Sequence, residues 1–299
     1  MENLTNLRKP YWLKSNKLGT KKTGKILKYL REYNLHTVCE SARCPNKGEC
    51  FDRGTATFMI LGNVCMRNCT FCAVEKGVQN IPEPDINEPV AIADLSHKLS
   101  LKHIVITTVT RDDLIDGGAS QFVKVINEIR KKCYDTTIEV LISDLKGEKE
   151  HLEKIINAKP DVLNHNVETI PRLYSEVRPM ADYNRSLSIL SNAKKIDKEM
   201  ITKSGLMVGL GETEKEILHL MEDLRKIKVD IITIGQYIAP TKKHFPVKEY
   251  VHPDVFEFYK NEGLKMGFRI VESAPLVRSS YHAEKVRKII KKQSQTNYL

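Results

Sequence analysis

Residues 55–72 read TATFMILGNVCMRNCTFC, an apolar run that leads directly into three cysteines. Cys65, Cys69 and Cys72 have the spacing C-x3-C-x2-C, so their thiolates can reach one metal centre. A four-iron cluster that is bound by three cysteines keeps one iron without a protein ligand, and chemistry takes place at such open positions. A tetrahedral zinc site would need a fourth ligand, and none follows Cys72 at the spacing of a zinc finger. The stretch therefore predicts an iron–sulfur centre at the end of a first strand.

Downstream of this stretch, apolar β-rich runs alternate with amphipathic helical stretches. Several runs are apolar at consecutive positions, as expected for parallel strands that are buried on both faces. The helical stretches repeat apolar residues at i, i+3, i+4 and i+7, and Thr213 with Glu216 forms a capping-box pattern before one of them. Six strand–helix units predict an α/β fold with a partial TIM-type (β/α)6 barrel, and a doubly wound open sheet is the alternative. The six runs are residues 55–61, 103–109, 137–142, 162–167, 206–210 and 231–238.

Polar or glycine-rich segments follow most of these runs. They comprise residues 107–113, 164–168, 209–212 and 235–237, and the three cysteines follow the first run. In a parallel β/α barrel, the loops after the carboxyl ends of the strands carry the functional groups. We therefore expect these segments to line one pocket at the top of a barrel.

A second group of three cysteines precedes the barrel, in CESARCPNKGEC. Cys39, Cys44 and Cys50 have the spacing C-x4-C-x5-C, and the proline, glycine and charged residues between them predict a loop. A small zinc knuckle or scattered thiols would also fit this segment by itself, but three further cysteines just downstream favour a second cluster. The expected organisation is an N-terminal extension with cluster ligands (1–54), the barrel (55–240) and a C-terminal extension (241–299).

The composition is ordinary for a soluble enzyme. Of the 299 residues, 41% are apolar and 29% charged, no apolar run could span a membrane, and the N-terminus lacks a secretory h-region. Seven cysteines, an odd number, indicate a reducing compartment, for which we expect the cytoplasm, with the isolated Cys133 as a half-buried free thiol. The net charge of +10 suits an anionic partner, but the lysines are mostly dispersed, so we expect neither nucleic acid nor membrane binding.

The C-x3-C-x2-C loop, with Phe71 before its last cysteine, resembles the cluster loop of radical S-adenosylmethionine (SAM) enzymes. Further segments closely resemble the lipoyl synthase family, in family order, from about residue 30 to residue 284. Two cysteine groups together with a C-terminal Arg-Ser-Ser-Tyr separate this family from other radical SAM enzymes. The matching segments are CESARCPNKGEC (39–50), GNVCMRNCTFCAV (62–74), RDDLIDGG (111–118), NHNVETIPRLYSEVRPMADY (164–183), KSGLMVGLGET (203–213), GQYIAP (235–240) and VESAPLVRSSYHA (271–283).

The resemblance implies the insertion of two sulfur atoms, at C6 and C8 of an octanoyl chain in amide linkage to a lysine of a carrier domain. These carbons carry unactivated C–H bonds, which offer nothing to a base or a side-chain nucleophile, so the chemistry has to come from cofactors. Cys65, Cys69 and Cys72 would hold a 4Fe–4S cluster that chelates SAM and cleaves it to methionine and a 5′-deoxyadenosyl radical. That radical would abstract hydrogen from the octanoyl chain.

The resemblance also implies a second 4Fe–4S cluster, which supplies the sulfur. A serine oxygen is a hard ligand among soft thiolates, so we expect one iron of this cluster to be lost easily as the cluster is consumed. We favour Ser280 as this ligand, although spacing does not separate it from the adjacent Ser279. The implied ligands of the second cluster are Cys39, Cys44, Cys50 and Ser280. The implied SAM contacts are Asn166 and Glu168 with ribose hydroxyls or the amino group, Arg178 with the carboxylate, Thr108 beside them, and the backbone at Gly209 with adenine.

The implied partners are an octanoylated lipoyl carrier domain, from a 2-oxoacid dehydrogenase E2 subunit or the glycine cleavage H protein, an electron donor such as ferredoxin or flavodoxin, and an iron–sulfur carrier. Two other functions compete. A biotin-synthase-like enzyme acting on a free small molecule would share the first cysteine group but lack the N-terminal one. A zinc-knuckle nucleic-acid-binding protein would use six cysteines and the positive charge, but interleaved exposed aromatics are lacking.

Overall fold

The centre of the protein is one eight-stranded sheet. The computed structural model describes residues 8–14, 20–42, 44, 46–52, 55–287 and 289–290. The strand order is β1-β2-β5-β6-β7-β8-β9-β10, and the short strands β3 and β4 form a separate pair. The strands are β1 (His36–Thr37), β2 (Thr57–Ile60), β3 (Val64–Cys65), β4 (Glu75–Lys76), β5 (His103–Thr108), β6 (Thr137–Leu141), β7 (Val162–Asn164), β8 (Ile201–Val208), β9 (Ile231–Gln236) and β10 (Ile270–Ser273).

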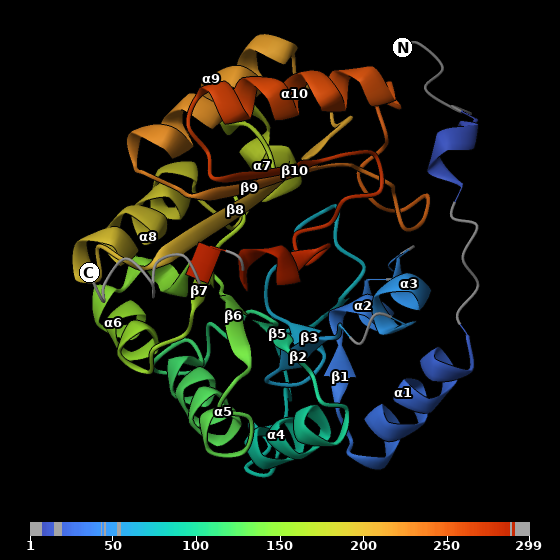
Figure 1. Ribbon diagram of the computed structural model, residues 1–299. Helices are drawn as coiled ribbons and strands as arrows, with labels where there is room; N and C mark the ends of the chain where they lie inside the picture. Colours follow the sequence, from blue (N-terminus) through green and yellow to red (C-terminus); the bar gives the residue numbers. More distant parts are fainter. Residues whose placement is uncertain are drawn as a thin grey trace.

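The six predicted strands correspond to β2 and β5 to β9, and all neighbours among them are parallel. Every residue of β2, β7 and β9 is buried, because helices cover the outer face and the inner face closes around the barrel interior. Figure 1 shows the helices in an arc outside the sheet, and this arrangement confirms the predicted partial barrel. The helices of the arc are α4 (Glu88–Lys98), α5 (Ala119–Lys132), α6 (Lys149–Asn157), α8 (Tyr183–Ile196), α9 (Glu214–Lys226) and α10 (Pro253–Lys265).

Helix α9 begins as predicted. The Thr213 hydroxyl accepts a hydrogen bond from Glu216 N, and the Glu216 carboxylate accepts one from Thr213 N at 2.8 Å, which completes the capping box.

The predicted bounds of β8 were wrong at the N-terminal end. The strand begins at Ile201 and not at residue 206, because its first half carries polar residues that are nevertheless buried. Lys203 Nζ donates to both carboxylate oxygens of Glu139 on β6, at 2.9 and 3.1 Å, and Thr202 N donates to Asp230. Sequence patterns treat such residues as exposed, whereas here partners inside the protein satisfy them.

The N-terminal extension adds a strand and small helices beside the open side of the barrel (Figure 1). Strand β1 pairs antiparallel with β2 at the sheet edge, after helix α1 (Lys21–Glu32). The predicted loop around the upstream cysteines was wrong, because two short helices occupy much of it, α2 (Val38–Ser41) and α3 (Lys47–Asp52). Thr37 caps α2 by accepting from Glu40 N, and helices this short need no periodic apolar pattern.

The C-terminal extension adds β10 in parallel to β9 and then crosses the barrel. Within this segment, Val277 lies against Gly235 at the carboxyl end of β9. Further along, Val286 packs against the first residues of three strands, at their opposite ends: Val162, Ile201 and Ile231. The segment therefore spans the barrel from one end of the strands to the other. None of the described helices combines the length and apolarity needed to cross a bilayer.

Candidate active site

The three downstream cysteines lie on the loop that follows β2, at the carboxyl ends of the parallel strands. Cys65 ends β3, and Cys69 and Cys72 follow in the next turn. Burial raises the pKa of Cys72 to about 11 and also raises the pKa of Cys69. Metals bind thiolates, so a metal bound here has to displace protons from these thiols.

Neighbouring loops hold this cysteine loop in place. Met66 N donates to Thr110 O at 3.0 Å, after β5, and Thr110 N donates to Cys65 Sγ at 3.3 Å. Thr70 N donates to Val177 O at 3.0 Å, at the end of helix α7 (Tyr174–Val177). Because the loop has little regular structure of its own, these contacts determine where the thiols point.

The upstream cysteines form the opposite part of the same site. Cys39 lies on α2, Cys50 lies on α3, and Cys44 lies between the two helices. Burial, and then repulsion by the neighbouring thiols, raises the pKa of Cys39 and of Cys50 to about 12. Both effects favour neutral thiols, so iron again has to displace protons when it binds.

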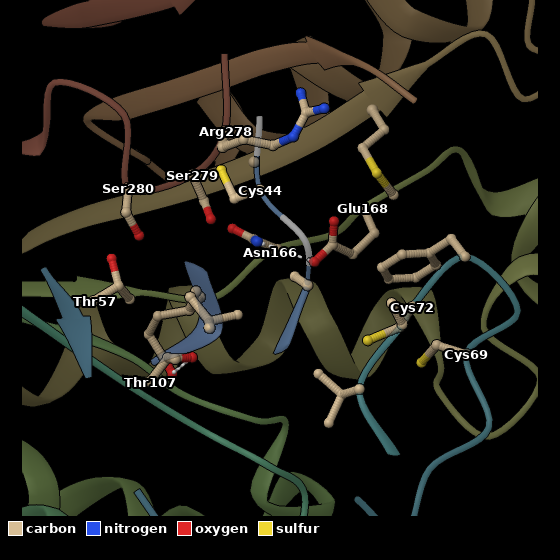
Figure 2. A pocket seen from close by; sticks show the side chains of 18 of the residues that line it. Cys44, Thr57, Cys69, Cys72, Thr107, Asn166, Glu168, Arg278, Ser279 and Ser280 are labelled. Atoms are coloured by element: carbon tan, nitrogen blue, oxygen red, sulfur yellow. Dashed lines mark hydrogen bonds between the residues drawn. The ribbon is translucent and has the colours of Figure 1, made fainter. Parts of the chain in front are cut away.

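Two serines of the C-terminal extension face these cysteines. Figure 2 shows the hydroxyls of Ser279 and Ser280 in the part of the cavity that contains Cys44 and Thr57. The two extensions are joined there, because Asn46 Nδ2 donates to Leu276 O at 2.6 Å. This contact explains how a serine near residue 280 reaches cysteines that precede the barrel.

One cavity of about 530 Å³ joins these groups. All six cysteines of the two groups line it, together with the segment Arg278–Tyr281 and the inner faces of the strands. No three Cys, His, Asp or Glu side chains in the described part of the chain converge closely enough to hold a single metal ion. In a four-iron cluster each thiolate binds a different iron, so ligands of a cluster need not meet at one point.

Asn166 and Glu168 extend into the cavity from the loop after β7 (Figure 2). Asn166 Nδ2 donates to Glu168 Oε1 at 3.0 Å, whereas Asn166 Oδ1 is buried and has no partner. Burial raises the pKa of Glu168, and the charge of Arg178 opposes this rise. A buried acceptor without a donor is costly, so this pair fits a ligand that brings hydroxyl or amino groups.

Arg178 lies beside this pair and is held by its own loop. Its Nη1 donates to Asn166 O at 3.0 Å and to Tyr174 Oη at 3.1 Å. Its Nε is buried and has no hydrogen-bond partner. The guanidinium thus has an unused donor in the cavity lining, as the binding of a carboxylate would require.

Thr108 and Gly209, two further predicted SAM contacts, occupy different places. Thr108 lines the cavity at the end of β5, with Oγ1 donating to Val109 O at 2.6 Å. Gly209 is not among the residues that line it, and a Cβ there would meet Gln236 Nε2 at 2.2 Å and Glu249 O at 2.4 Å. The missing side chain of Gly209 therefore makes room for the protein's own groups, and contact of its backbone with adenine stays a prediction.

Sequence reasoning missed a glycine and a charged group at this site. Gly205 lines the cavity, and a Cβ there would lie 2.9 Å from Asn166 Oδ1. Arg67 lines it from within the cysteine loop, together with Asp144 after β6. A charged residue inside the C-x3-C-x2-C spacing, with aspartates on neighbouring strand ends, was the available signal. The lining has five basic residues against two acidic ones: Lys9, Arg67, Lys76, Arg178 and Arg278 against Asp144 and Glu168.

Comparison with protein families supports the iron–sulfur interpretation. The model of the radical SAM superfamily matches residues 59–224, and that of the N-terminal domain of lipoyl synthase matches residues 1–44. The lipoyl synthase of Caldanaerobacter subterraneus subsp. tengcongensis is 55% identical over 279 residues, which cover 93% of this chain and 96% of the relative. That of Caldicellulosiruptor saccharolyticus is 53% identical over 283 residues, covering 95% and 99%.

Solved structures share the fold at much lower identity. A methylornithine synthase superposes with a TM-score of 0.56 at 12% identity, covering 88% of this chain and 83% of the other. The FeFe-hydrogenase maturase HydG from Carboxydothermus hydrogenoformans gives 0.55 at 14% identity, covering 91% and 78%. These similarities agree with the partial β/α barrel.

Proposed function

The chain belongs to the lipoyl synthase family of radical SAM enzymes, and from this premise we propose how its cavity divides the work. The enzyme is a sulfurtransferase that uses SAM and two 4Fe–4S clusters, and it inserts two sulfur atoms at C6 and C8 of a protein-bound octanoyl-lysine. The observation that carries the division is that both cysteine groups line one cavity.

Cys65, Cys69 and Cys72 hold the cluster that binds SAM, and the second set of ligands is Cys39, Cys44, Cys50 and Ser280. When bound, the clusters supply the electron that splits SAM and the sulfur atoms that enter the product. The short helices α2 and α3 and the join between Asn46 and Leu276 support the second set. Both hydroxyls of the serine pair face the cavity, and we assign the ligand to Ser280.

The SAM site consists of Asn166, Glu168, Arg178 and Thr108. The unpartnered Nε of Arg178 binds the SAM carboxylate, and the unpartnered Oδ1 of Asn166 accepts from a hydroxyl or amino group. Gly205, and not Gly209, leaves room for Asn166.

The rest of the lining suits an acyl chain. Apolar side chains from several strands and loops exclude water from carbons that carry no polar group. No acid or base is needed at those carbons. The apolar lining includes Met59, Val109, Leu141, Leu206 and Met207.

The substrate is an octanoylated carrier domain, for which we propose an E2 subunit or the glycine cleavage H protein. A ferredoxin or flavodoxin would deliver electrons, and an iron–sulfur carrier would rebuild the second cluster. We place the chain in the cytoplasm, where all seven of its cysteines would stay unpaired, as they are in the structure.

Replacing Cys44 with alanine tests the division. The variant should keep SAM cleavage but lose sulfur insertion, and its iron content should fall from about eight to about four per chain after anaerobic reconstitution. The matched control is Cys133→Ala, a buried thiol that does not line the cavity, and it should keep full iron and activity. Sulfur insertion by the Cys44→Ala protein would refute the second-cluster assignment.

A further inference from the structure

Arg67 lies in the cysteine loop, between Cys65 and Cys69. Its side chain forms hydrogen bonds with neighbouring loops of the protein. The side chain is only 10% exposed. Its Nε and Nη2 both donate to the carboxylate of Asp112, after β5. Its Nη2 also donates to Asp144 Oδ1 at 3.0 Å, and its Nη1 donates to Met180 O at 2.6 Å. One guanidinium thus joins the cysteine loop to the loops after β5, β6 and β7.

A second arginine completes the network. Arg185, in the first turn of α8, donates through Nε to Asp144 Oδ2 at 2.7 Å and through Nη2 to Met180 O at 3.3 Å. The Asp144 side chain is 2% exposed. Two arginines and two aspartates balance in charge, so a neutral, largely buried network links four strand-end loops.

The carbonyl that both arginines share lies two residues after Arg178. The backbone between them is tight, because Ala181 N donates to Arg178 O at 2.8 Å. Arg67 therefore contacts the segment that carries the SAM carboxylate partner, while its own backbone belongs to the loop that carries the thiols. Arg178 Nη1 donates within its own loop, to Asn166 O, Val167 O and Tyr174 Oη, and the guanidinium also interacts with Cys69, where it opposes the rise in the pKa of that thiol.

We infer that Arg67 is a positioning residue that sets the separation between the three cysteines and Arg178, so that SAM can bind the cluster iron and Arg178 together. The inference rests on the proposed SAM site. It requires a guanidinium, because a lysine ammonium is a single point and cannot bind Asp112, Asp144 and Met180 O in fixed directions.

The geometry predicts a local effect when Arg67 is replaced. Asp144 keeps Arg185, and Met180 O keeps one of its two donors. Only the hydrogen bonds of the Arg67 side chain are lost, whereas the backbone contacts of Met66 with Thr110 and of Thr70 with Val177 remain, and the cysteines themselves stay. The thiol ligands should therefore still assemble a cluster, while its position relative to Arg178 becomes less defined.

The test uses the full chain, reconstituted anaerobically, as Arg67→Lys and Arg67→Gln. Both variants should keep wild-type iron content and bind SAM about tenfold more weakly, the loss expected for one charge-assisted hydrogen bond. The change that SAM produces in the electron paramagnetic resonance spectrum of the reduced cluster should broaden or disappear. A positive charge alone does not restore this spectral change, so Arg67→Lys should behave like Arg67→Gln.

Arg130 offers a matched control at the opposite ends of the strands. It also joins a carboxylate to two carbonyls, donating to Asp161 Oδ2 at 2.7 Å, to Thr136 O at 2.8 Å and to Lys159 O at 3.0 Å. Arg130→Lys should leave both the dissociation constant of SAM and the spectral change at their wild-type values. An equal loss of SAM affinity in this control would overturn the inference, because the effect would then be general.

If an Arg67 variant loses its iron, Asp112→Asn tests the same contact between Arg67 and Asp112 without a change in the cysteine loop. Like the Arg67 variants, it should weaken SAM binding and broaden the spectral change that SAM produces. Wild-type affinity and spectra in Asp112→Asn, or in iron-loaded Arg67 variants, would refute the positioning role. If Arg178→Lys leaves SAM affinity unchanged, the proposed SAM site fails; if only the Arg178 variant weakens binding, the site stands and the role of Arg67 fails.

Discussion

Gly205 and Gly209 are close in sequence, but the absence of a side chain leaves space for different neighbouring groups at the two positions. A Cβ on Gly205 would lie 2.6 Å from Thr233 Oγ1 and 2.9 Å from Asn166 Oδ1, inside the cavity. Gly209 has a φ of +94°, which disfavours other residues, and it faces Gln236 and the backbone of Glu249. At the scale of single residues, one glycine therefore shapes the proposed SAM site and the other permits a turn.

Alanine at each of these positions should separate the two roles. Gly205→Ala should weaken SAM binding about tenfold through displacement of Asn166, with a smaller loss of stability. Gly209→Ala should lower the free energy of unfolding by about 1–3 kcal/mol, because of backbone strain and the clash with Glu249, and leave SAM affinity of the folded protein unchanged. Calorimetric SAM titration and urea unfolding measure the two quantities. If both variants lose SAM affinity equally, Gly209 belongs to the site after all.

Among the elements, strands β6 and β8 are joined below the cavity by a buried ion pair. Glu139 and Lys203 have side chains 0% and 3% exposed, and Asn164 Nδ2 on β7 donates to Glu139 Oε1 at 2.8 Å. Burial alone would raise the pKa of Glu139, but Lys203 and His103 outweigh it and hold this pKa at about 2. Lys203, one of the polar residues because of which the sequence pattern missed the first half of β8, thus belongs to the barrel interior.

This pair should affect stability and its pH dependence. Glu139→Gln leaves the Lys203 ammonium buried without a counter-charge and should lower the free energy of unfolding by about 3–5 kcal/mol at pH 7. Since the pKa of Glu139 is lower in the folded chain than its ordinary 4.5, its contribution is full above about pH 4.5 and is lost as pH falls toward 2. Urea unfolding across this range should show that the free energy of unfolding falls less with decreasing pH in Glu139→Gln than in the wild-type protein.

Two comparisons sharpen this prediction. The double variant Glu139→Leu/Lys203→Met should recover most of the loss, because it removes both buried charges. Asp135→Asn, in an exposed pair with Lys102, should change stability by less than about 0.5 kcal/mol. A Glu139→Gln protein as stable as the Asp135→Asn control would contradict the structural role of the pair.

At the scale of the whole molecule, the two extensions close the barrel into a reaction cavity. We propose the division 1–54, 55–240 and 241–299, in which neither extension completes the cavity alone. Lys9 and Lys76 are exposed residues of the lining, and both are basic. Carrier domains are commonly acidic, so these lysines should attract the carrier to the mouth of the cavity.

Salt should therefore affect the two substrates differently. Raising the ionic strength should increase KM for the octanoylated carrier domain several-fold and leave KM for SAM nearly constant, since enclosed charges are screened less than exposed ones. Lys76→Glu should raise KM for the carrier at low salt, whereas Lys102→Glu, at the opposite end of the strands, should not. Equal salt sensitivity for both substrates would remove the basis for steering.

The sequence by itself determined the parallel strands, the capping box of α9 and both cysteine groups, because apolar periodicity and short spacings are local properties of the chain. It also placed Asn166 and Glu168 at the end of one strand. It misjudged the start of β8 and the small helices around Cys39 and Cys50, where burial or a single cap outweighs the pattern.

Only the tertiary structure decided what depends on distant residues meeting. It separated Gly205 from Gly209, brought Asn46 to Leu276, and connected Arg67 to Asp144 and Met180. Hydrogen bonds and van der Waals contacts act over a few ångströms, and spacing along the chain does not state which residues folding brings within that range.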